Sequence, residues 1–223
     1  MCASSNGLVV KDMATEVVRK RYDRRAPLYD LMEGFAEMLG LGKWRKEQWG
    51  KVAAGSILEV GVGTGKNFPY YPPDTEITAI DFSEKMLSRA RDKACKQGIK
   101  VRLLPMDVQK LDFVDNTFDN VVATFVFCSV PDPLKGLAEV KRVCKPGGKV
   151  ILLEHVLSAN RPMAGLMNRA NPVVAKIMGA NINRRTVENV TRSGLVVERV
   201  TDLGAGIVKL IEARKANAYP GSR

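Results

Sequence analysis

The chain is poor in the residues that build metal centres and disulfide frameworks. Its 223 residues include one histidine and four cysteines, and no two cysteines form a C-x-x-C pair. A zinc or iron site and a disulfide-stapled fold are therefore not expected. No charged-then-apolar targeting segment opens the sequence, which favours a reducing cytosol over a secreted location.

Long hydrophobic runs and an acidic surplus are also missing. The longest strongly apolar stretches, residues 121–130 and 150–157, are much shorter than the roughly 20 residues that span a bilayer. Lys and Arg together number 35 against 24 Asp and Glu, which gives a formal net charge of +11. This surplus favours an anionic partner, such as nucleic acid, a lipid surface or an acidic ligand, without choosing among them.

The first 50 residues predict a helical segment that meets a surface. Charged residues dominate positions 11–25, where Met13, Val17 and Tyr22 fall at helical spacing. This pattern indicates a basic amphipathic helix. We expect residues 1–50 to form a helical cap that contacts substrate and lies on an anionic membrane, where each basic residue contributes about 1 kcal/mol.

From residue 56 short apolar runs alternate with helical segments. We expect strands at residues 56–60, 76–80, 100–104, 120–123, 149–154, 196–201 and 207–213, and helices near 67–70, 83–96, 133–144 and 184–193. Strands separated by helices are typical of βαβ units, so the fold class is α/β with a mainly parallel sheet.

Three further segments lie outside this alternation. Residues 145–148 (KPGG) predict a turn before the fifth strand. Residues 158–183 fit neither the strand nor the helix period and are expected to form an insertion over the site. Residues 216–223 predict a flexible tail.

A glycine-rich loop follows the first strand. Residues 57–67 read ILEVGVGTGKN, with Gly61, Gly63 and Gly65 at alternating positions. Glycine lets the backbone turn tightly and lets a ligand approach it closely. Asp81 ends the next strand, where a carboxylate can accept hydrogen bonds from ribose hydroxyls. These features predict a nucleoside cleft at the carboxyl ends of parallel strands.

The spacing of this loop disfavours the common phosphate-binding loops. A dinucleotide fingerprint, G-x-G-x-x-G, needs its third glycine one position later. A Walker loop needs glycine where Val60 stands and a hydroxyl where Asn67 stands. The segment instead resembles the E-x-G-x-G-x-G loop of the class I S-adenosylmethionine-dependent methyltransferases.

This resemblance extends over residues 50–155. The segments PMDV at 105–108, FDNVV at 118–122 and LAEVKRVCKPGG at 137–148 match the family's third strand end, fourth strand, and the helix and turn before the fifth. The resemblance implies a Rossmann-like, doubly wound, seven-stranded, mainly parallel sheet with helices on both faces, over residues 51–215, plus N-terminal helices. It also implies S-adenosylmethionine as cofactor and S-adenosylhomocysteine as product.

Carried over residue by residue, the resemblance assigns a cofactor site. It places the methionine moiety against the three glycines, the ribose on Asp81 and the adenine amino group near Asp107. Phe82 and Met86 would flank the adenine, although apolar residues at this spacing are as often core. The implied cofactor-binding set is Glu59, Gly61, Gly63, Gly65, Asn67, Asp81, Phe82, Met86, Met106, Asp107 and Val108.

Candidates for the chemistry itself are fewer. Methyl transfer from a sulfonium is an in-line displacement that needs alignment and desolvation and no metal. Tyr22 and Tyr29 could contact the donor or attract an amine, or they could be packing aromatics. His155 could accept a proton, or it could hydrogen-bond at a strand end. We expect Cys128 to be a packing residue rather than a nucleophile.

At a finer level, YDLM at 29–32, FCSVPDP at 127–133 and LEHV at 153–156 resemble one methyltransferase group. It includes quinone-biosynthesis enzymes, soluble bacterial phosphatidylethanolamine N-methyltransferases and thiol methyltransferases. Residues 33–35 depart from the quinone pattern, which favours the phospholipid enzymes. Arg161, Arg184 and Arg185 could then bind a phosphodiester, or they could form a solvated basic face.

The expected activity is N-methylation of phosphatidylethanolamine toward phosphatidylcholine, with a small quinone or thiol acceptor as the alternative. We expect a cytoplasmic, peripherally membrane-associated monomer that takes a phospholipid or another small-molecule acceptor. Nucleic acid is not an expected partner, because the sequence has neither an asparagine-proline-proline-aromatic motif nor an appended binding domain.

Overall fold

The computed structural model describes residue 16 and residues 40–178, 180–204 and 206–217. The basic helix predicted at 11–25 lies outside the described residues except for Glu16, which is helical. Tyr22 and Tyr29 also lie outside them, as do residues 218–223 of the predicted tail.

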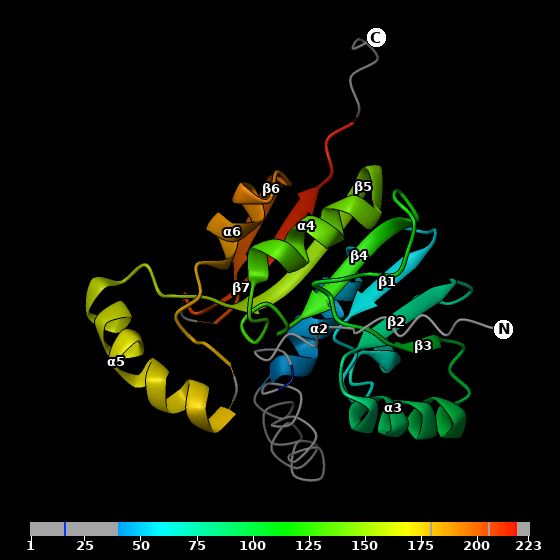
Figure 1. Cartoon of the computed structure of the whole chain (residues 1–223), viewed down its shortest axis with the longest axis horizontal. Coiled ribbons are helices and arrows are strands. Elements are labelled where there is room, and N and C mark those ends of the chain that lie inside the picture. Colours follow the sequence, from blue (N-terminus) through cyan, green and yellow to red (C-terminus); the bar gives the residue numbers. More distant parts are fainter. Residues whose placement is uncertain (1–15, 17–39, 179, 205, 218–223) are drawn as a thin grey trace, which may run out of the picture.

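A seven-stranded sheet forms the centre of the molecule (Figure 1). Its strands are β1 (Ile57–Val60), β2 (Ile77–Asp81), β3 (Arg102–Pro105), β4 (Phe118–Thr124), β5 (Cys144–His155), β6 (Val196–Asp202) and β7 (Val208–Arg214). Their spatial order is β3-β2-β1-β4-β5-β7-β6, and β7 runs antiparallel to both of its neighbours. The remaining pairs are parallel. The predicted Rossmann-like, mainly parallel α/β sheet is confirmed.

Helices cover both faces of the sheet, because successive strand residues point to opposite sides. α4 (Pro133–Val143) and α6 (Thr186–Arg192) pack over the face that carries Leu58 and Val121. α2 (Gly42–Trp49) and α3 (Glu84–Gln97) cover the face that carries Ile57, Ala79 and Val122. The helix expected near 67–70 is the short 3-10 helix η2 (Phe68–Tyr70).

The order of the strands reverses beside β1. Strand β1 pairs with β2 on one side and with β4 on the other, so the chain steps outward to β3 and then returns. In open α/β sheets, ligands bind in the crevice at the carboxyl ends of the strands beside such a reversal. The topology therefore predicts a ligand site at the carboxyl ends of β1 and β4.

Polar caps fix the start of the two helices nearest this edge. The Ser83 hydroxyl accepts a hydrogen bond from the Met86 amide at 3.2 Å and begins α3. The Asp132 carboxylate accepts from the Lys135 amide at 3.0 Å and begins α4, with Pro133 in the first turn. Such caps satisfy amide groups that have no partner within the helix.

The prediction that a turn at residues 145–148 precedes the fifth strand is wrong. Strand β5 already begins at Cys144, which pairs with Phe118, and pairing resumes at Lys149 with Asn120. The residues between the two pairs bulge out of the ladder, and Gly147 has a left-handed φ of 73°. A glycine pair thus lets the strand accommodate extra residues.

Residues 158–183, which were not assigned to a helix or a strand, are mostly helical, and their place over the site stays a prediction. They contain α5 (Arg161–Met178), and the Asn160 side chain accepts a hydrogen bond from the Met163 amide at 3.1 Å at its start. The sequence does carry a helical period here, because Met163, Leu166, Ala170 and Val173 recur at helical spacing and Pro172 falls between them. Neither α5 nor another helix in the described part of the chain is long and apolar enough to cross a membrane.

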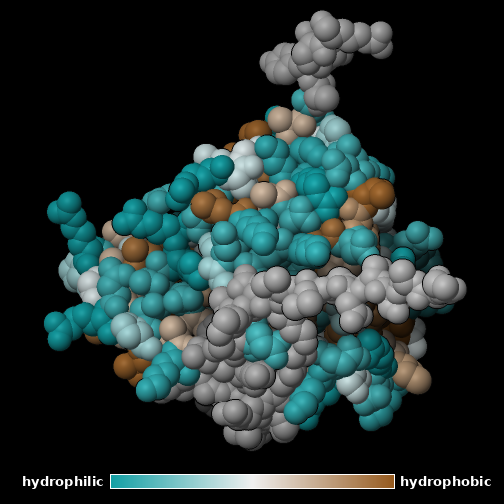
Figure 2. Space-filling model, in the orientation of Figure 1, coloured by the Kyte–Doolittle hydropathy of each residue, from teal (hydrophilic) through white to brown (hydrophobic). Residues whose placement is uncertain are grey.

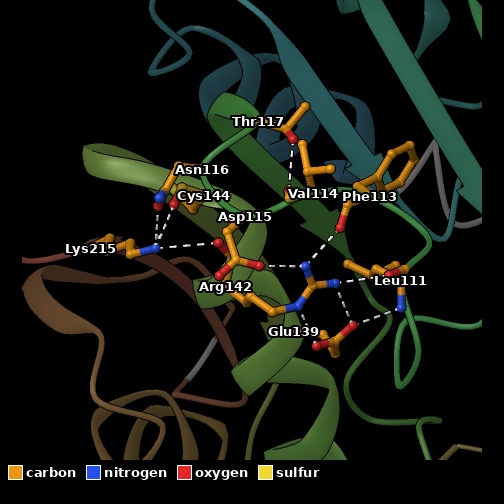
Figure 3. Close-up of polar contacts among 10 residues, drawn as sticks. All are labelled: Leu111, Phe113, Val114, Asp115, Asn116, Thr117, Glu139, Arg142, Cys144 and Lys215. Atoms are coloured by element: carbon orange, nitrogen blue, oxygen red, sulfur yellow. Dashed lines mark hydrogen bonds and ion pairs between the residues drawn. The ribbon is translucent and has the colours of Figure 1, made fainter.

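An arginine near the end of α4 fixes the loop before β4. Figure 3 shows the Arg142 guanidinium between the helix and residues 111–117. It donates to both oxygens of Glu139 at 2.7 and 2.8 Å and to Asp115 at 2.8 Å. It also donates to the carbonyls of Phe113 at 2.7 Å and Leu111 at 2.8 Å. These five acceptors match the five donors of a guanidinium.

We expect Arg142→Lys to lower the free energy of unfolding by about 2 kcal/mol, because an ammonium cannot reproduce the paired donors of the guanidinium. Urea-induced unfolding measures the change. Arg91→Lys is the control, since Arg91 makes one exposed ion pair with Glu84, and it should cost less than about 0.5 kcal/mol. Equal losses in the two variants would contradict the role given to Arg142.

Candidate active site

An open cleft of about 710 Å³, including its mouth, lies at the predicted edge of the sheet. Its walls are the loop after β1, the ends of β2 and β3, and the loop after β4. A concave site with mostly apolar walls and a few polar groups is typical of a small-molecule ligand or cofactor site. Eight of the eleven predicted cofactor residues line the cleft: Gly61, Gly63, Asp81, Phe82, Met86, Met106, Asp107 and Val108.

The three loop glycines have left-handed backbones for two different reasons. Their φ angles are 70° at Gly61, 55° at Gly63 and 79° at Gly65. A Cβ at Gly61 would lie 2.4 Å from Val126, and one at Gly65 would lie 2.3 Å from Phe68, so the fold itself requires these two glycines. A Cβ at Gly63 would meet no protein atom within 4 Å. Gly63 therefore leaves space that a ligand can occupy.

Asp81 stands at the rim of the cleft, at the end of β2. One carboxylate oxygen accepts a hydrogen bond from the Gly63 amide, and the other accepts from the Ser83 amide, each at 2.9 Å. These two contacts fix the carboxylate between the glycine loop and α3. Its position suits a group that accepts hydrogen bonds from a ribose.

A buried polar network supports the glycine loop from behind. The Asn67 amide group donates to Glu59 at 2.6 Å and to Thr124 at 3.0 Å. The Tyr71 hydroxyl donates to Glu59, and Arg45 donates to Asn67 at 2.9 Å. Burial raises the pKa of Glu59 to about 7, against the opposing effect of the Tyr71 and Asn67 hydrogen bonds. Glu59 and Asn67 therefore lie beneath the loop, and Gly65 packs on Phe68. None of these three residues lines the cleft.

Comparison with known proteins gives the family. Residues 58–152 match a family model described as a methyltransferase domain. Over 156 residues the chain is 38% identical to the "Phosphatidylethanolamine N-methyltransferase" of Cereibacter sphaeroides. The aligned region covers 69% of this chain and 75% of that protein. The chain belongs to the S-adenosylmethionine-dependent methyltransferases. Its cofactor is S-adenosylmethionine.

Other relatives of this methyltransferase carry different names. The chain is 36% identical to the "Ubiquinone/menaquinone biosynthesis C-methyltransferase UbiE" of Desulfotalea psychrophila, over 61% of this chain and 57% of that one. It is 32% identical to the "Thiol S-methyltransferase TMT1B" of Rattus norvegicus, over 62% and 59%. A Thermotoga maritima methyltransferase structure shares the fold, with a TM-score of 0.67 and 19% identity over 89% and 99% of the chains.

The residues of the cleft fit the cofactor. The space above Gly63 could hold the methionine chain, because a side chain there would fill it. Asp81 could accept hydrogen bonds from the ribose hydroxyls. Phe82, Met86 and Met106 supply an apolar wall for the adenine, and Asp107 lies beside it in the lining.

The burial of two polar side chains of α2 was not predicted from the sequence. Arg45 and Gln48 are 4% and 0% exposed. Gln48 donates to the Ala123 carbonyl at 2.8 Å and accepts from the Thr124 hydroxyl at 2.7 Å, so it joins α2 to the end of β4. The helix reads GKWRKEQW, which has no apolar stripe, and so periodicity gave no signal for these contacts.

The loop after β4 is fixed by a second buried carboxyl group. Glu154 of β5 accepts hydrogen bonds from the amides of Val126 at 2.8 Å and Phe127 at 2.9 Å. Burial raises the pKa of Glu154 to about 7. Burial, followed by the charge of Glu154, raises the pKa of Cys128 to about 12. The thiol is therefore protonated at neutral pH, in keeping with packing rather than nucleophilic chemistry.

His155 packs against a residue of the cleft wall. Its ring stacks on Phe125 with 4.6 Å between centroids, and Phe125 lines the cleft. Phe125 has a left-handed φ of 56°, which a bulky residue rarely adopts outside constrained sites. Burial lowers the pKa of His155, so the imidazole is neutral at physiological pH.

The structure brings two of the three predicted substrate arginines together, because Arg184 and Arg185 both line a second open pocket. Arg184 is half-buried, and its guanidinium donates to the Val130 carbonyl of the cleft wall at 3.0 Å. Arg185 is exposed and pairs with Glu188 at 3.4 Å. Arg161 is exposed at the start of α5. Of the three, Arg184 contacts the cleft wall.

Gly63→Ala is expected to weaken the binding of S-adenosylhomocysteine at least about tenfold, because the new methyl group occupies ligand space. Isothermal titration calorimetry measures the affinity. Gly98→Ala is the matched control: Gly98 has a φ of 65° and also has no atom within 4 Å of a Cβ, but it ends α3. Both variants should lose about 1–2 kcal/mol of stability from the left-handed backbone. Equal affinities in the two variants would refute the assignment.

Glu154→Gln should change how stability depends on pH. The pKa of Glu154 is raised from 4.5 to about 7 in the folded protein, so the folded state holds a proton that the unfolded state has released. The stability from this group is complete below about pH 4.5 and is lost as the pH rises through 7. Relative to wild type, the variant should gain about 1–3 kcal/mol between pH 5 and pH 8 in urea unfolding. A constant difference across this range would contradict the raised pKa.

Proposed function

We propose that this methyltransferase transfers a methyl group to the amine of phosphatidylethanolamine, toward phosphatidylcholine, at a membrane surface. The observation that carries the proposal is the 38% identity to a phosphatidylethanolamine N-methyltransferase over 75% of that protein. Matches of 36% and 32% to a quinone and a thiol methyltransferase support the alternative, a small quinone or thiol acceptor.

The chain's own residues bind and align the reactants in this proposal. The loop at Gly63 holds the methionine part of the cofactor, Asp81 the ribose and Asp107 the adenine amino group. When bound, the cofactor supplies an electrophilic methyl group on a sulfonium. The apolar side chains of Val126 and Val130 in the cleft wall keep water from the reacting centre. Positioning of this kind can account for roughly 7–11 kcal/mol of the barrier.

Arg184 is the best placed of the proposed substrate residues for a headgroup phosphodiester. One of its nitrogens is held by the Val130 carbonyl, which fixes the guanidinium beside the cleft wall. Its Nε is buried and has no hydrogen-bond partner among the residues that the structure describes. A buried donor without a partner favours an acceptor supplied by a ligand. Arg161 and Arg185 remain proposed substrate residues, which would bind the outer part of the headgroup.

The attacking amine must lose a proton to carry a lone pair. His155 is neutral and so can accept one, and its ring stacks on Phe125, a residue of the cleft wall. Tyr22 and Tyr29 remain proposed catalytic residues from outside the described part of the chain.

The acceptor is tested by supplying labelled S-adenosylmethionine with three classes of compound in separate reactions. We expect label in phosphatidylethanolamine, presented in detergent micelles, and detect it by mass analysis of the products. Label in a demethylated quinone or a small alkyl thiol, with none in the phospholipid, would overturn the proposal in favour of the alternative.

Arg184→Gln should lower kcat/KM for phosphatidylethanolamine about tenfold, because the phosphodiester loses a charged donor. The affinity for S-adenosylhomocysteine should stay unchanged. Arg192→Gln, an exposed arginine in the last turn of α6, is the control and should leave kcat/KM unchanged. A normal kcat/KM in Arg184→Gln would remove this residue from the acceptor site.

A further inference from the structure

Helix α5 exposes a stripe of apolar side chains. Met163, Leu166 and Val173 are 44%, 62% and 59% exposed. At 100° of rotation per residue, the three lie within about 80° of one another around the helix axis. Figure 1 shows α5 standing away from the sheet at the lower left, and Figure 2 shows brown apolar surface there between teal side chains. Grouped exposed apolar side chains of this kind mark interaction surfaces.

The charge of α5 has one sign. Its sequence, RPMAGLMNRANPVVAKIM, holds two arginines and a lysine and no acidic residue. Arg169 and Lys176 are exposed and lie within about 60° of Val173 around the axis. An apolar stripe beside cationic side chains is typical of helices that lie in the interface of a bilayer. The surface complementary to both features is a membrane with anionic headgroups.

Hydrogen bonds tie α5 to the wall of the cleft. The Asn171 side chain accepts from the Ile182 amide at 2.9 Å, and the Asn181 amide donates to the Cys128 carbonyl at 2.8 Å. Cys128 lies in the loop after β4, whose next three residues line the cleft. These two asparagines therefore connect α5 to the wall of the cleft.

We infer that α5 docks on an anionic lipid bilayer. The stripe of Met163, Leu166 and Val173 enters the interfacial layer, while Arg169 and Lys176 contact the headgroups. Docking holds the loop after β4 close to the lipid from which a headgroup enters the cleft. This inference rests on the proposed function for its biological use, because a bilayer-bound acceptor is what makes such docking useful.

The test is co-sedimentation of the full chain with vesicles of equimolar phosphatidylcholine and phosphatidylglycerol, which contain no acceptor lipid. The double variant Leu166→Ser/Val173→Ser should bind these vesicles about tenfold more weakly, since it removes two apolar side chains from the interface. Arg169→Glu/Lys176→Glu should lose a similar factor, and the loss should shrink at high salt. Unchanged binding in both double variants would overturn the inference.

Matched controls come from other surfaces of the molecule. Val114 is 76% exposed in the loop before β4, and Lys96 is exposed in the last turn of α3. Val114→Ser and Lys96→Glu should leave vesicle binding unchanged. If the α5 variants change only self-association in sedimentation velocity, the stripe binds a second copy of the chain, and the lipid assignment is wrong.

A dispersed short-chain phosphatidylethanolamine separates this inference from the proposed function. The α5 variants should keep wild-type kcat/KM on the dispersed substrate and lose it on vesicles that contain phosphatidylethanolamine. A wild-type protein that binds vesicles through α5 and methylates neither form would refute the proposed acceptor alone. Variants that bind vesicles like wild type would refute α5 docking, whichever acceptor is methylated.

Discussion

The backbone between β1 and η2 must turn with a left-handed conformation while leaving open space above it, and much of the site depends on this loop. Gly61 and Gly65 pack against Val126 and Phe68 so closely that no side chain fits. Gly63, between them, faces space free of protein atoms and donates its amide to Asp81. Residues 61–65 thus pack on the core from one side, and Gly61 and Gly63 line the cleft on the other.

Two buried glutamates hold the two loops that face each other across the cleft. Glu59 bonds to Asn67 below the glycine loop, and Glu154 bonds to the amides of the loop after β4. Burial raises the pKa of each to about 7. Because the pKa of both carboxyl groups is raised in the folded protein, the stability of the fold decreases as the pH rises toward 7.

The acceptor side of the molecule is built from contacts between distant segments. Arg184, which precedes α6, bonds to the loop after β4, and the asparagines of α5 bond to the segment that leads to that arginine. Hydrogen bonds therefore connect the apolar and cationic surface of α5 to the wall of the cofactor cleft. A membrane contact at α5 and the entry of a lipid headgroup can then involve the same loop.

The sequence by itself determined the sheet, the glycine loop and the position of Asp81, because these follow from local apolar periods and from the conformations that only glycine adopts easily. The roles of Arg45, Gln48 and Glu154 were decided by tertiary structure, since their partners lie 22 or more residues away along the chain. The same holds for the stacking of His155 on Phe125. For α5 the apolar period is present in the sequence, whereas the hydrogen bonds of Asn168 and Asn171 to residues 181–183 were decided by the tertiary structure. Such long-range hydrogen bonds leave no period in a sequence, so the folded chain alone reveals them.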